Sequence, residues 1–394
     1  MLSDRQLFLQ HVGLPSEYPS MVEAERAEGI YIYDKNGKEY VDLCSGVSVS
    51  NIGHRHPKVI KAIKNQLDKY MHLMVYGEYV QSPQVQFAKL LTDQLPENLS
   101  SVYFVNSGSE ATEGALKLAK RFTGRSEIIS MKNSYHGSTH GALSVLGSEY
   151  YKTAFRPLLP DIRFINFNNI ADLEQITELT ACVILEPIQS EAGAVVPEND
   201  YLKKLRERCT QTGTLMIFDE VQTGFGRTGH LFAFQKYGVV PDILTVAKSM
   251  GGGLPLGAFI SAKNIMDTLK NNPILGHITT FGGHPVSCSA ALASLNVLLD
   301  EKIISTVAEK SELFKKLLKN NDKILSIKGE GLLLAVELES NEAVLKFAKK
   351  KIEVGLLTDI FLFAQNKFRI GPPLTITKDE IVKTCKLIER ALEE

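Results

Sequence analysis

Two charged residues near the middle of the chain each follow a short apolar run. Asp219 comes directly after residues 215–218, and Lys248 comes directly after residues 243–247. Short apolar runs bounded by turn residues are typical of buried parallel strands. Because ligands of open α/β sheets bind beyond the carboxyl ends of the strands, we expect both charges to face one crevice. Asp219 and Lys248 are therefore candidates for chemistry.

A third polar group precedes a predicted helix. Residues 106–111, Asn-Ser-Gly-Ser-Glu-Ala, follow a predicted strand, and the apolar spacing after them is helical. Ser107 and Glu110 match a capping box, so a helix start with no further role is one interpretation. The other is an anion site, because the free amides of a helix start, together with Gly108 and the hydroxyls of Ser107 and Ser109, can bind a phosphate.

An apolar strand followed by Asp219 and Glu220 is also found in nucleotide-hydrolysing proteins that bind magnesium. Those proteins need the phosphate-binding pattern GxxxxGK[ST]. The only Gly-Lys pair in this chain is Gly37-Lys38, and Glu39 follows it. The sequence therefore argues strongly against an ATPase.

The segment GFGRTG at residues 224–229 matches the dinucleotide-binding pattern GxGxxG. In a dinucleotide-binding fold this pattern lies directly between a strand and a helix. Here residues 219–223 intervene, and Gly-Arg-Thr-Gly is typical of a turn. An NAD-dependent dehydrogenase is therefore only a distant alternative.

Pyridoxal phosphate chemistry needs a lysine that forms an imine, an acid that keeps the pyridine nitrogen protonated, and a cradle for the phosphate. Lys248, Asp219 and residues 106–111 suit these three tasks. A solvated lysine at a strand end is the alternative for Lys248. The triple glycine at residues 251–253 argues against that alternative, because it lets a ligand approach the backbone closely. The three groups together favour the cofactor.

Seven segments resemble, in the same order, those of the class III, ornithine-type aminotransferases of the fold-type-I pyridoxal phosphate enzymes. They are NSGSEA, SYHG, EPIQSEAG, FDEVQTGFGRTG, AKSMGGGLPLGA, TTFGGHP and RIGPPL, and they extend over nearly the whole chain. The resemblance implies an aminotransferase that moves an amino group from an amine or amino acid, including ω-amino donors, to a 2-oxo acid such as 2-oxoglutarate. A pyridoxal phosphate-dependent aminomutase, racemase or decarboxylase on the same fold is the alternative.

The resemblance also implies roles for individual residues. Lys248 would hold the cofactor covalently, and Asp219 would bind its ring nitrogen. Tyr135 and Val221 would cover the two faces of the ring, and Gln222 would approach its hydroxyl. The implied cofactor contacts are Ser107, Gly108, Ser109, Tyr135, His136, Glu186, Asp219, Val221, Gln222, Lys248 and Thr280.

Three of the implied contacts concern the substrates and a second subunit. Arg369 matches an arginine that binds the carboxylate of the dicarboxylic substrate, and Glu191 matches a glutamate that covers this arginine when the amino donor is bound. A planar guanidinium suits a carboxylate, although a static salt bridge between the two residues is the alternative. Thr280 would reach the phosphate of a partner subunit, which implies a homodimer with shared active sites.

One position departs from the family pattern. Many members that act on acetylornithine, ornithine or 4-aminobutyrate have an arginine directly after the His-Gly of the YHG segment, where it binds the far carboxylate of the substrate. Here Ser138 follows Gly137. This favours a donor without that carboxylate contact, or one whose carboxylate binds another basic residue such as Arg55 or Arg156.

The bulk composition is that of an ordinary globular protein. The chain has 394 residues, 44% of them hydrophobic and 23% charged, with a formal net charge of −1. This charge gives no reason to expect nucleic acid or a membrane surface as a partner. The five scattered cysteines form no CxxC pair, which argues against a disulfide framework or a zinc site and indicates a reducing compartment. We expect a cytoplasmic protein without a metal.

Apolar runs alternate with helical patterns over residues 101–246, which predicts an α/β fold with a mainly parallel sheet covered on both faces. Strands are expected over residues 101–105, 127–131, 162–167, 181–185, 214–218 and 243–246. After residue 285 the pattern indicates a smaller α+β domain. The predicted division is an N-terminal segment (1–50) that joins the small domain, a large cofactor-binding domain (51–285) and a C-terminal small domain (286–394).

Overall fold

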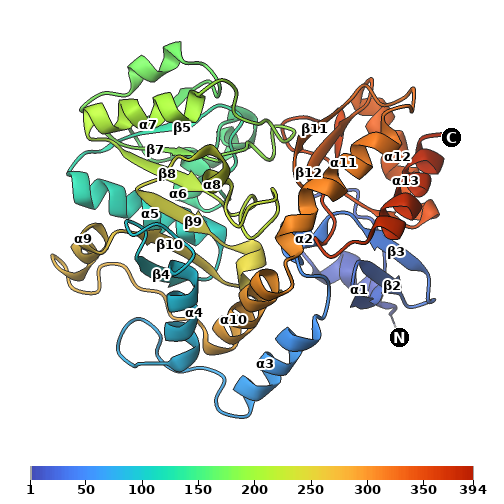
Figure 1. Ribbon diagram of the computed structural model, residues 1–394, viewed down its shortest axis with the longest axis horizontal. Helices are drawn as coiled ribbons and strands as arrows, with labels where there is room; N and C mark the ends of the chain where they lie inside the picture. The colour runs from blue at the N-terminus through green and yellow to red at the C-terminus, as the bar shows by residue number, and fades with distance from the viewer. Residues whose placement is uncertain (1, 394) are drawn as a thin grey trace.

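The computed structural model describes residues 2–393 as two regions that lie side by side (Figure 1). A seven-stranded sheet with helices around it forms the larger region, and two smaller sheets with three C-terminal helices form the other. The first strands of the chain and its last helices lie together in the smaller region, so the two ends of the chain build one body. The residue boundaries of the predicted domains stay a prediction.

The large sheet contains every strand that the apolar runs predicted. Its strand order is β4-β10-β9-β8-β7-β5-β6. The strands β5 to β9 pair in parallel, whereas β10 pairs antiparallel with both β4 and β9. The antiparallel strand β10 was not predicted. The bounds are β4 Ser101–Val105, β5 Glu127–Met131, β6 Ile162–Ile165, β7 Thr180–Leu185, β8 Leu215–Asp219, β9 Ile243–Val246 and β10 Gly257–Ser261.

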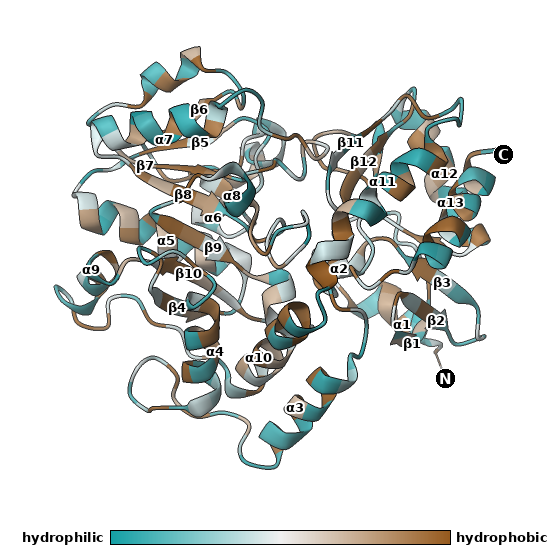
Figure 2. Cartoon of the chain, in the orientation of Figure 1, coloured by the Kyte–Doolittle hydropathy of each residue, from teal (hydrophilic) through white to brown (hydrophobic). Residues whose placement is uncertain are grey.

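The large sheet is buried on both faces. Successive residues of one strand belong to two different apolar clusters, since Ile217 packs in one and its neighbours Met216 and Phe218 pack in the other. Side chains that alternate across a strand explain why these strands are apolar at almost every position. The central strands are accordingly brown along their length in Figure 2. In β8 the one charged residue, Asp219, is the last of the strand.

Helices cover the large sheet and extend below it in Figure 1. Helix α5 packs on β9 and β10, and α10 packs on α3 and α4. Proline occupies the first helical position of α3, where its missing amide hydrogen costs nothing. The bounds are α3 Pro57–Leu67, α4 Ser82–Thr92, α5 Gly108–Thr123, α6 His140–Ser144, α7 Tyr201–Thr212, α8 Ala233–Tyr237, α9 Lys263–Met266 and α10 Pro285–Asp300.

The two smaller sheets combine both ends of the chain. One has the order β1-β2-β3-β13, in which the C-terminal β13 pairs in parallel with β3, and the other has the order β11-β12-β14. Thr377 and Glu380 form a capping box at the start of α13, in which the backbone amide of each residue donates to the side chain of the other. The bounds are α1 Asp4–His11, β1 Ala24–Glu28, β2 Tyr31–Asp34, β3 Glu39–Asp42, α11 Val307–Leu318, β11 Ser326–Glu330, β12 Leu333–Glu337, α12 Asn341–Val354, β13 Leu356–Leu357, β14 Lys367–Ile370 and α13 Lys378–Glu393.

Two features are absent from residues 2–393: a membrane-spanning helix and a metal-binding cluster of side chains. No helix there is long and apolar enough to cross a membrane. No group of three or more His, Cys, Asp or Glu side chains there is placed to hold a metal ion. The cytoplasmic location stays a prediction.

The GFGRTG segment forms a turn and connects three parts of the chain. Arg227 has no exposed side-chain surface and donates to the carbonyls of Leu332 and Pro372, at 3.0 and 2.6 Å, and to the side chain of Asn51. Asn51 in turn donates to the carbonyl of Phe225 at 2.9 Å. The segment that matched a dinucleotide-binding pattern therefore has a structural role.

Replacing Arg227 with methionine should destabilise the fold. The three acceptors around it would lose a charged donor while remaining buried, which costs about 3 kcal/mol of unfolding free energy. Urea unfolding followed by circular dichroism measures the change. Arg390→Met, at an exposed position of α13, is the control and should unfold like the wild type. Equal midpoints for the Arg227 variant and the wild type would contradict this role.

Candidate active site

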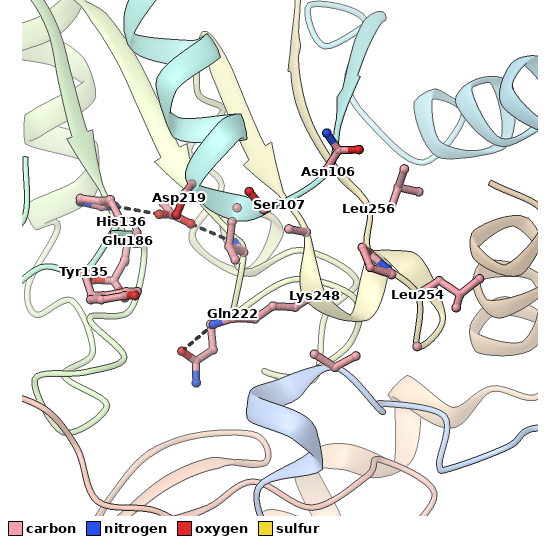
Figure 3. Close-up of a pocket in the computed structure, with 18 residues that line it drawn as sticks. Asn106, Ser107, Tyr135, His136, Glu186, Asp219, Gln222, Lys248, Leu254 and Leu256 are labelled. Atoms are coloured by element: carbon pink, nitrogen blue, oxygen red, sulfur yellow. Dashed lines mark hydrogen bonds and ion pairs between the residues drawn. The ribbon is translucent and has the colours of Figure 1, made fainter. Parts of the chain in front are cut away.

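A cavity of ≈ 420 Å³ lies beyond the carboxyl ends of the central strands (Figure 3). This volume is in the range of sites for small ligands. Its walls come from the β4–α5 connection, the segment after β5, the ends of β7, β8 and β9, and the loop at residues 253–256. Ten of the eleven predicted cofactor contacts line it: Ser107, Gly108, Ser109, Tyr135, His136, Glu186, Asp219, Val221, Gln222 and Lys248.

Asp219, the last residue of β8, lies at the floor of the cavity with little exposed surface. Its Oδ2 lies 2.7 Å from Nδ1 of His136, and its Oδ1 accepts a hydrogen bond from the amide of Val221 at 3.0 Å. Nearby Glu186 accepts hydrogen bonds from the amides of Tyr135 and Ser190. Burial raises the pKa of Glu186 to about 7. Figure 3 shows this group of polar side chains on one side of the cavity.

Lys248 follows β9 and begins a short 3₁₀ turn, Lys248–Gly251. Its backbone is left-handed, with φ 51°, a conformation that costs a non-glycine residue about 1–2 kcal/mol. Burial lowers the pKa of the Lys248 amine, and the charge of Glu191 partly opposes this effect. Its Nζ donates to the side-chain oxygen of Gln222 at 3.3 Å. The site thus holds a half-buried amine, on a strained backbone, close to a carboxylate.

The start of α5 forms the opposite wall. Ser107 is its N-cap and accepts a hydrogen bond from the amide of Glu110 at 3.2 Å. The predicted capping box is only half present, because the Glu110 carboxylate accepts from the amide of Asn106 at 2.6 Å instead of returning to Ser107. A Cβ at Gly108 would lie 2.9 Å from a methyl carbon of Val221, so only glycine fits there. The first-turn amides of a helix have no partner within it and suit an anion.

The YHG segment closes on the same helix start. Gly137 has φ +122°, and a Cβ there would lie 2.1 Å from Oγ of Ser109. The amide of Ser138 donates to that Oγ at 3.2 Å, and the Ser138 hydroxyl lies 3.1 Å from the Tyr135 hydroxyl. Ser138 therefore binds neighbouring polar groups at the rim, where many family members have an arginine.

Two buried nitrogens of the cavity have no hydrogen-bond partner among residues 2–393. They are Nε2 of His136 and Nε2 of Gln222. Buried polar groups almost always have a partner, so both nitrogens fit a bound molecule with polar atoms. A ring that bears a hydroxyl, a charged nitrogen and a phosphate would match these residues. Gln222 suits the hydroxyl, Asp219 the nitrogen and the start of α5 the phosphate. The residues present therefore fit pyridoxal phosphate.

Glu191 and Arg369 form a buried ion pair near Lys248, and both influence its charge. Glu191 Oε1 lies 2.7 Å from Nη2 of Arg369, and the two side chains are 9% and 1% exposed. Although burial opposes ionisation, the charge of Arg369 holds the pKa of Glu191 below its usual value. The two residues that the sequence assigned to the substrate site thus lie together.

Besides Glu191 and Arg369, three further predicted or alternative residues do not line the cavity. Thr280 is exposed and does not line the cavity of its own chain. Arg156 pairs with Glu149 at 2.6 Å on the surface. Arg55 lines a neighbouring cavity that shares Val49 and residues 253–254 with the first one.

Two contacts near the site were not predicted: those of Asn106, which belongs to the predicted phosphate cradle, and that of Asp359, which was not a candidate at all. Asn106 lines the cavity and donates through Nδ2 to Glu110 and to Thr279, at 2.9 Å each. Asp359 lies 3.0 Å from Nε of Arg369. The distance between these partners along the chain hides the contacts: Thr279 is 173 residues from Asn106.

Residues 14–392 match the family model "Aminotransferase class-III". The chain belongs to the class-III aminotransferases. Members of this family depend on pyridoxal phosphate, and the enzyme moves an amino group from a donor to a 2-oxo acid. The ATPase, dehydrogenase, aminomutase, racemase and decarboxylase alternatives are therefore set aside.

Several curated relatives of this aminotransferase are similar over most of their length. An acetylornithine aminotransferase of Clostridium acetobutylicum is 39% identical, over 94% of this chain and 96% of the relative. One of Methanocaldococcus jannaschii is 40% identical, over 93% and 92%. The [LysW]-aminoadipate semialdehyde/glutamate semialdehyde transaminase of Sulfurisphaera tokodaii is 38% identical, over 81% and 82%.

Solved structures of aminotransferases have the same fold. The ornithine aminotransferase of Toxoplasma gondii, with PLP at partial occupancy in its active site, superimposes with a TM-score of 0.89 at 31% identity, over 98% of this chain and 92% of that one. The adenosylmethionine-8-amino-7-oxononanoate aminotransferase of Methanocaldococcus jannaschii gives 0.91 at 31% identity, over 99% and 98%. The α/β fold of the fold-type-I enzymes, predicted from the sequence, is confirmed.

Proposed function

We propose that the cavity between Lys248 and the start of α5 binds pyridoxal phosphate, with Lys248 as its covalent attachment. The observation that carries this proposal is that a half-buried amine, a buried carboxylate and free helix amides line one cavity. Asp219 would face the ring nitrogen and Gln222 the ring hydroxyl. Gly108 and Ser109 would hold the phosphate, because the start of a helix favours negative charge.

Bound pyridoxal phosphate supplies a carbonyl carbon that bonds to amines and a ring that withdraws electrons. Asp219 would place its carboxylate at the ring nitrogen, and His136 orients this carboxylate through the 2.7 Å contact. The amine of Lys248 would remove a proton from the carbon that bears the amino group of the donor and would later return one. Burial favours this role, because it lowers the pKa of Lys248 and thus increases the neutral form of the amine.

A dicarboxylic 2-oxo acid, 2-oxoglutarate, is the proposed acceptor. Arg369 would bind its far carboxylate, since a guanidinium offers paired donors in a plane. Glu191 now occupies one edge of Arg369, so it would have to give way. When Glu191 returns, the pocket would again accept a donor that has no carboxylate at that position.

A terminal primary amine is the proposed class of donor. The semialdehyde named for the Sulfurisphaera tokodaii relative is what remains when a terminal amine loses its amino group. Ser138 offers no cation for a far carboxylate. The lining of the cavity includes no arginine, so a donor without a far carboxylate fits this side of the site.

A homodimer with shared active sites is proposed as well. Large apolar side chains are exposed in two segments, residues 71–80 and residues 274–281. Val80 is 93% exposed in the first segment, and Ile274 is 75% exposed in the second. The segments touch, since the rings of His72 and Phe281 lie 4.8 Å apart. Exposed apolar surface of this kind marks an interface. Thr280 lies within it, so a second copy of the chain could extend Thr280 toward this cavity.

Replacing Lys248 with alanine should abolish the reaction with the amino donor. A base that transfers a proton contributes about 10²–10⁴-fold, so the single-turnover rate should fall at least ~10³-fold. Absorbance of the bound cofactor and the yield of oxo product measure it. Lys61→Ala changes an exposed lysine of α3 and is the control. A Lys248→Ala protein that binds the cofactor with an unchanged visible spectrum would remove Lys248 as the covalent attachment.

Replacing Arg369 with glutamine should impair the reaction with 2-oxoglutarate as acceptor and spare the reaction with pyruvate as acceptor. A charged hydrogen bond contributes about 1.5–3 kcal/mol, so the KM for 2-oxoglutarate should rise by roughly 10–100-fold. Steady-state kinetics with both acceptors and one ω-amino donor measure it, and Arg156→Gln is the surface control. Thermal unfolding of the holoenzyme verifies that the variant is folded. Unchanged kinetics with 2-oxoglutarate would remove Arg369 from the site.

Replacing Phe281 with glutamate should separate the subunits. A charge buried at an apolar interface is costly, so sedimentation equilibrium should detect a monomer where the wild type is a dimer. The variant should also bind the cofactor less tightly. Leu179→Glu, at a position 74% exposed before β7, should leave the dimer intact. A monomeric wild type at micromolar concentration would contradict the proposed assembly.

A further inference from the structure

Arg369 contacts two carboxylates. Its Nη2 lies 2.7 Å from Glu191 Oε1, and its Nε lies 3.0 Å from Asp359 Oδ1. The ring of Phe361 lies 4.6 Å from the guanidinium carbon. The three neighbours enclose the guanidinium, whose side chain is 1% exposed. The three charged groups together have a net charge of −1.

The two carboxylates are attached to different parts of the chain. Asp359 follows β13 and is tied to the backbone of Arg369 itself, because the amide of Arg369 donates to the Asp359 carbonyl at 3.0 Å. The Thr358 hydroxyl also donates to the Arg369 carbonyl. Glu191 lies in the segment after β7. Asp359 is therefore fixed relative to Arg369, whereas Glu191 belongs to another segment.

The hydrogen bonds of the two carboxylates also differ. Glu191 accepts a hydrogen bond from Arg369 at 2.7 Å and another from the amide of Leu362 at 3.2 Å. The Asp359 contact is a charge contact without hydrogen-bond alignment, and Nε and Nη1 of Arg369 have no hydrogen-bond partner within residues 2–393. Arg369 thus has donors to spare for a carboxylate of the substrate while Asp359 remains beside it.

The burial of Arg369 makes its second carboxylate important. If Glu191 gave way and Asp359 were absent, a buried guanidinium would be left without a counter-ion until the substrate arrived. Such a state is strongly unfavourable, because an unpaired charge loses its hydration and gains nothing in return. Asp359, with 34% of its side chain exposed, keeps both a charge contact with Arg369 and contact with solvent.

We propose that Asp359 is a positioning residue that neutralises and orients Arg369 while Glu191 gives way to the carboxylate of the 2-oxo acid. The proposal rests on the proposed role of Arg369 in binding that carboxylate. Asp359 itself does not touch the substrate. It lowers the barrier to opening of the Glu191–Arg369 pair, so it acts on the acceptor half of the reaction and not on the donor half.

The test compares four holoenzymes: wild type, Asp359→Asn, Glu191→Gln and the double variant. Stopped-flow absorbance of the cofactor follows the donor half-reaction and the acceptor half-reaction separately. Asp359→Asn should lower kcat/KM for 2-oxoglutarate about 10-fold or more, because opening of the Glu191–Arg369 pair then leaves Arg369 without a counter-ion. The rate of the donor half-reaction and kcat/KM for pyruvate should each change less than about 2-fold. Asp322→Asn, on the exposed surface, is the matched control.

The double variant separates this role from simple structural support. With Glu191 replaced by a neutral side chain, no carboxylate has to leave Arg369, so the acceptor half-reaction of the folded double variant should match that of Glu191→Gln within about 3-fold. Its Tm should be lower than that of either single variant, because Arg369 then has no carboxylate beside it. A double variant as impaired as Asp359→Asn would overturn the proposal, because Asp359 would then only support the fold around Arg369. An unimpaired Asp359→Asn enzyme would also overturn it.

The wild type distinguishes failure of this inference from failure of the proposed function. A wild-type enzyme that does not prefer 2-oxoglutarate to pyruvate would overturn both the role of Arg369 and that of Asp359. A wild type with the preference, combined with an insensitive Asp359→Asn variant, would overturn the inference about Asp359 alone.

Discussion

The parallel pairing of β8 with β9 is the constraint on which the site depends. Asp219 pairs with Thr245, so the end of β8 and the residues just after β9 reach the same edge of the sheet. Because both faces of the sheet are buried, neither strand has room for a charge before its end. A slip in this register would separate the carboxylate from Lys248 and leave one of them in an apolar core.

Burial makes the charges at this edge chemically useful, and it also makes them costly. Desolvation lowers the pKa of Lys248 and raises that of Glu186 to about 7, whereas the charge of Arg369 keeps Glu191 ionised. Each group is accompanied by hydrogen bonds or by an opposite charge, as buried ionisable groups require. Helix α5 adds free amides at the other wall, so one end of the cavity favours an anion and the other holds an amine whose pKa is lowered by burial.

Local patterns were enough to predict most of the sheet and the central groups of the cavity, whereas Tyr135, His136, Glu186, Val221 and Gln222 followed only from the resemblance to the family. Apolar runs ended by Asp219 and Lys248, and a glycine before a helix at Gly108, are signals that a few neighbouring residues carry. Strand β10 was missed because its apolar run follows the glycine-rich loop, and an apolar run alone does not show the direction of pairing. The Glu110 contact with Asn106 was missed because a capping box and its shifted form have the same sequence.

Asp359 belongs to a different class of residue, one that sequence patterns do not reveal. Asp359 comes from a loop, which has no periodic pattern of apolar residues. Its partner Arg369 lies on a strand, and a backbone hydrogen bond between the two residues holds the loop against that strand. Arg369, Glu191 and Asp359 together have a formal charge of −1, and Ser138 at the rim adds no positive charge. This site therefore attracts a second anion less than a site with an arginine at position 138 would. The relatives share about 40% of their residues with this chain, and the family match over residues 14–392 identifies the type of reaction. In the proposed mechanism, the charges around Arg369 and the residue at position 138 decide which amines can serve as donors, because they differ in what they offer to a carboxylate.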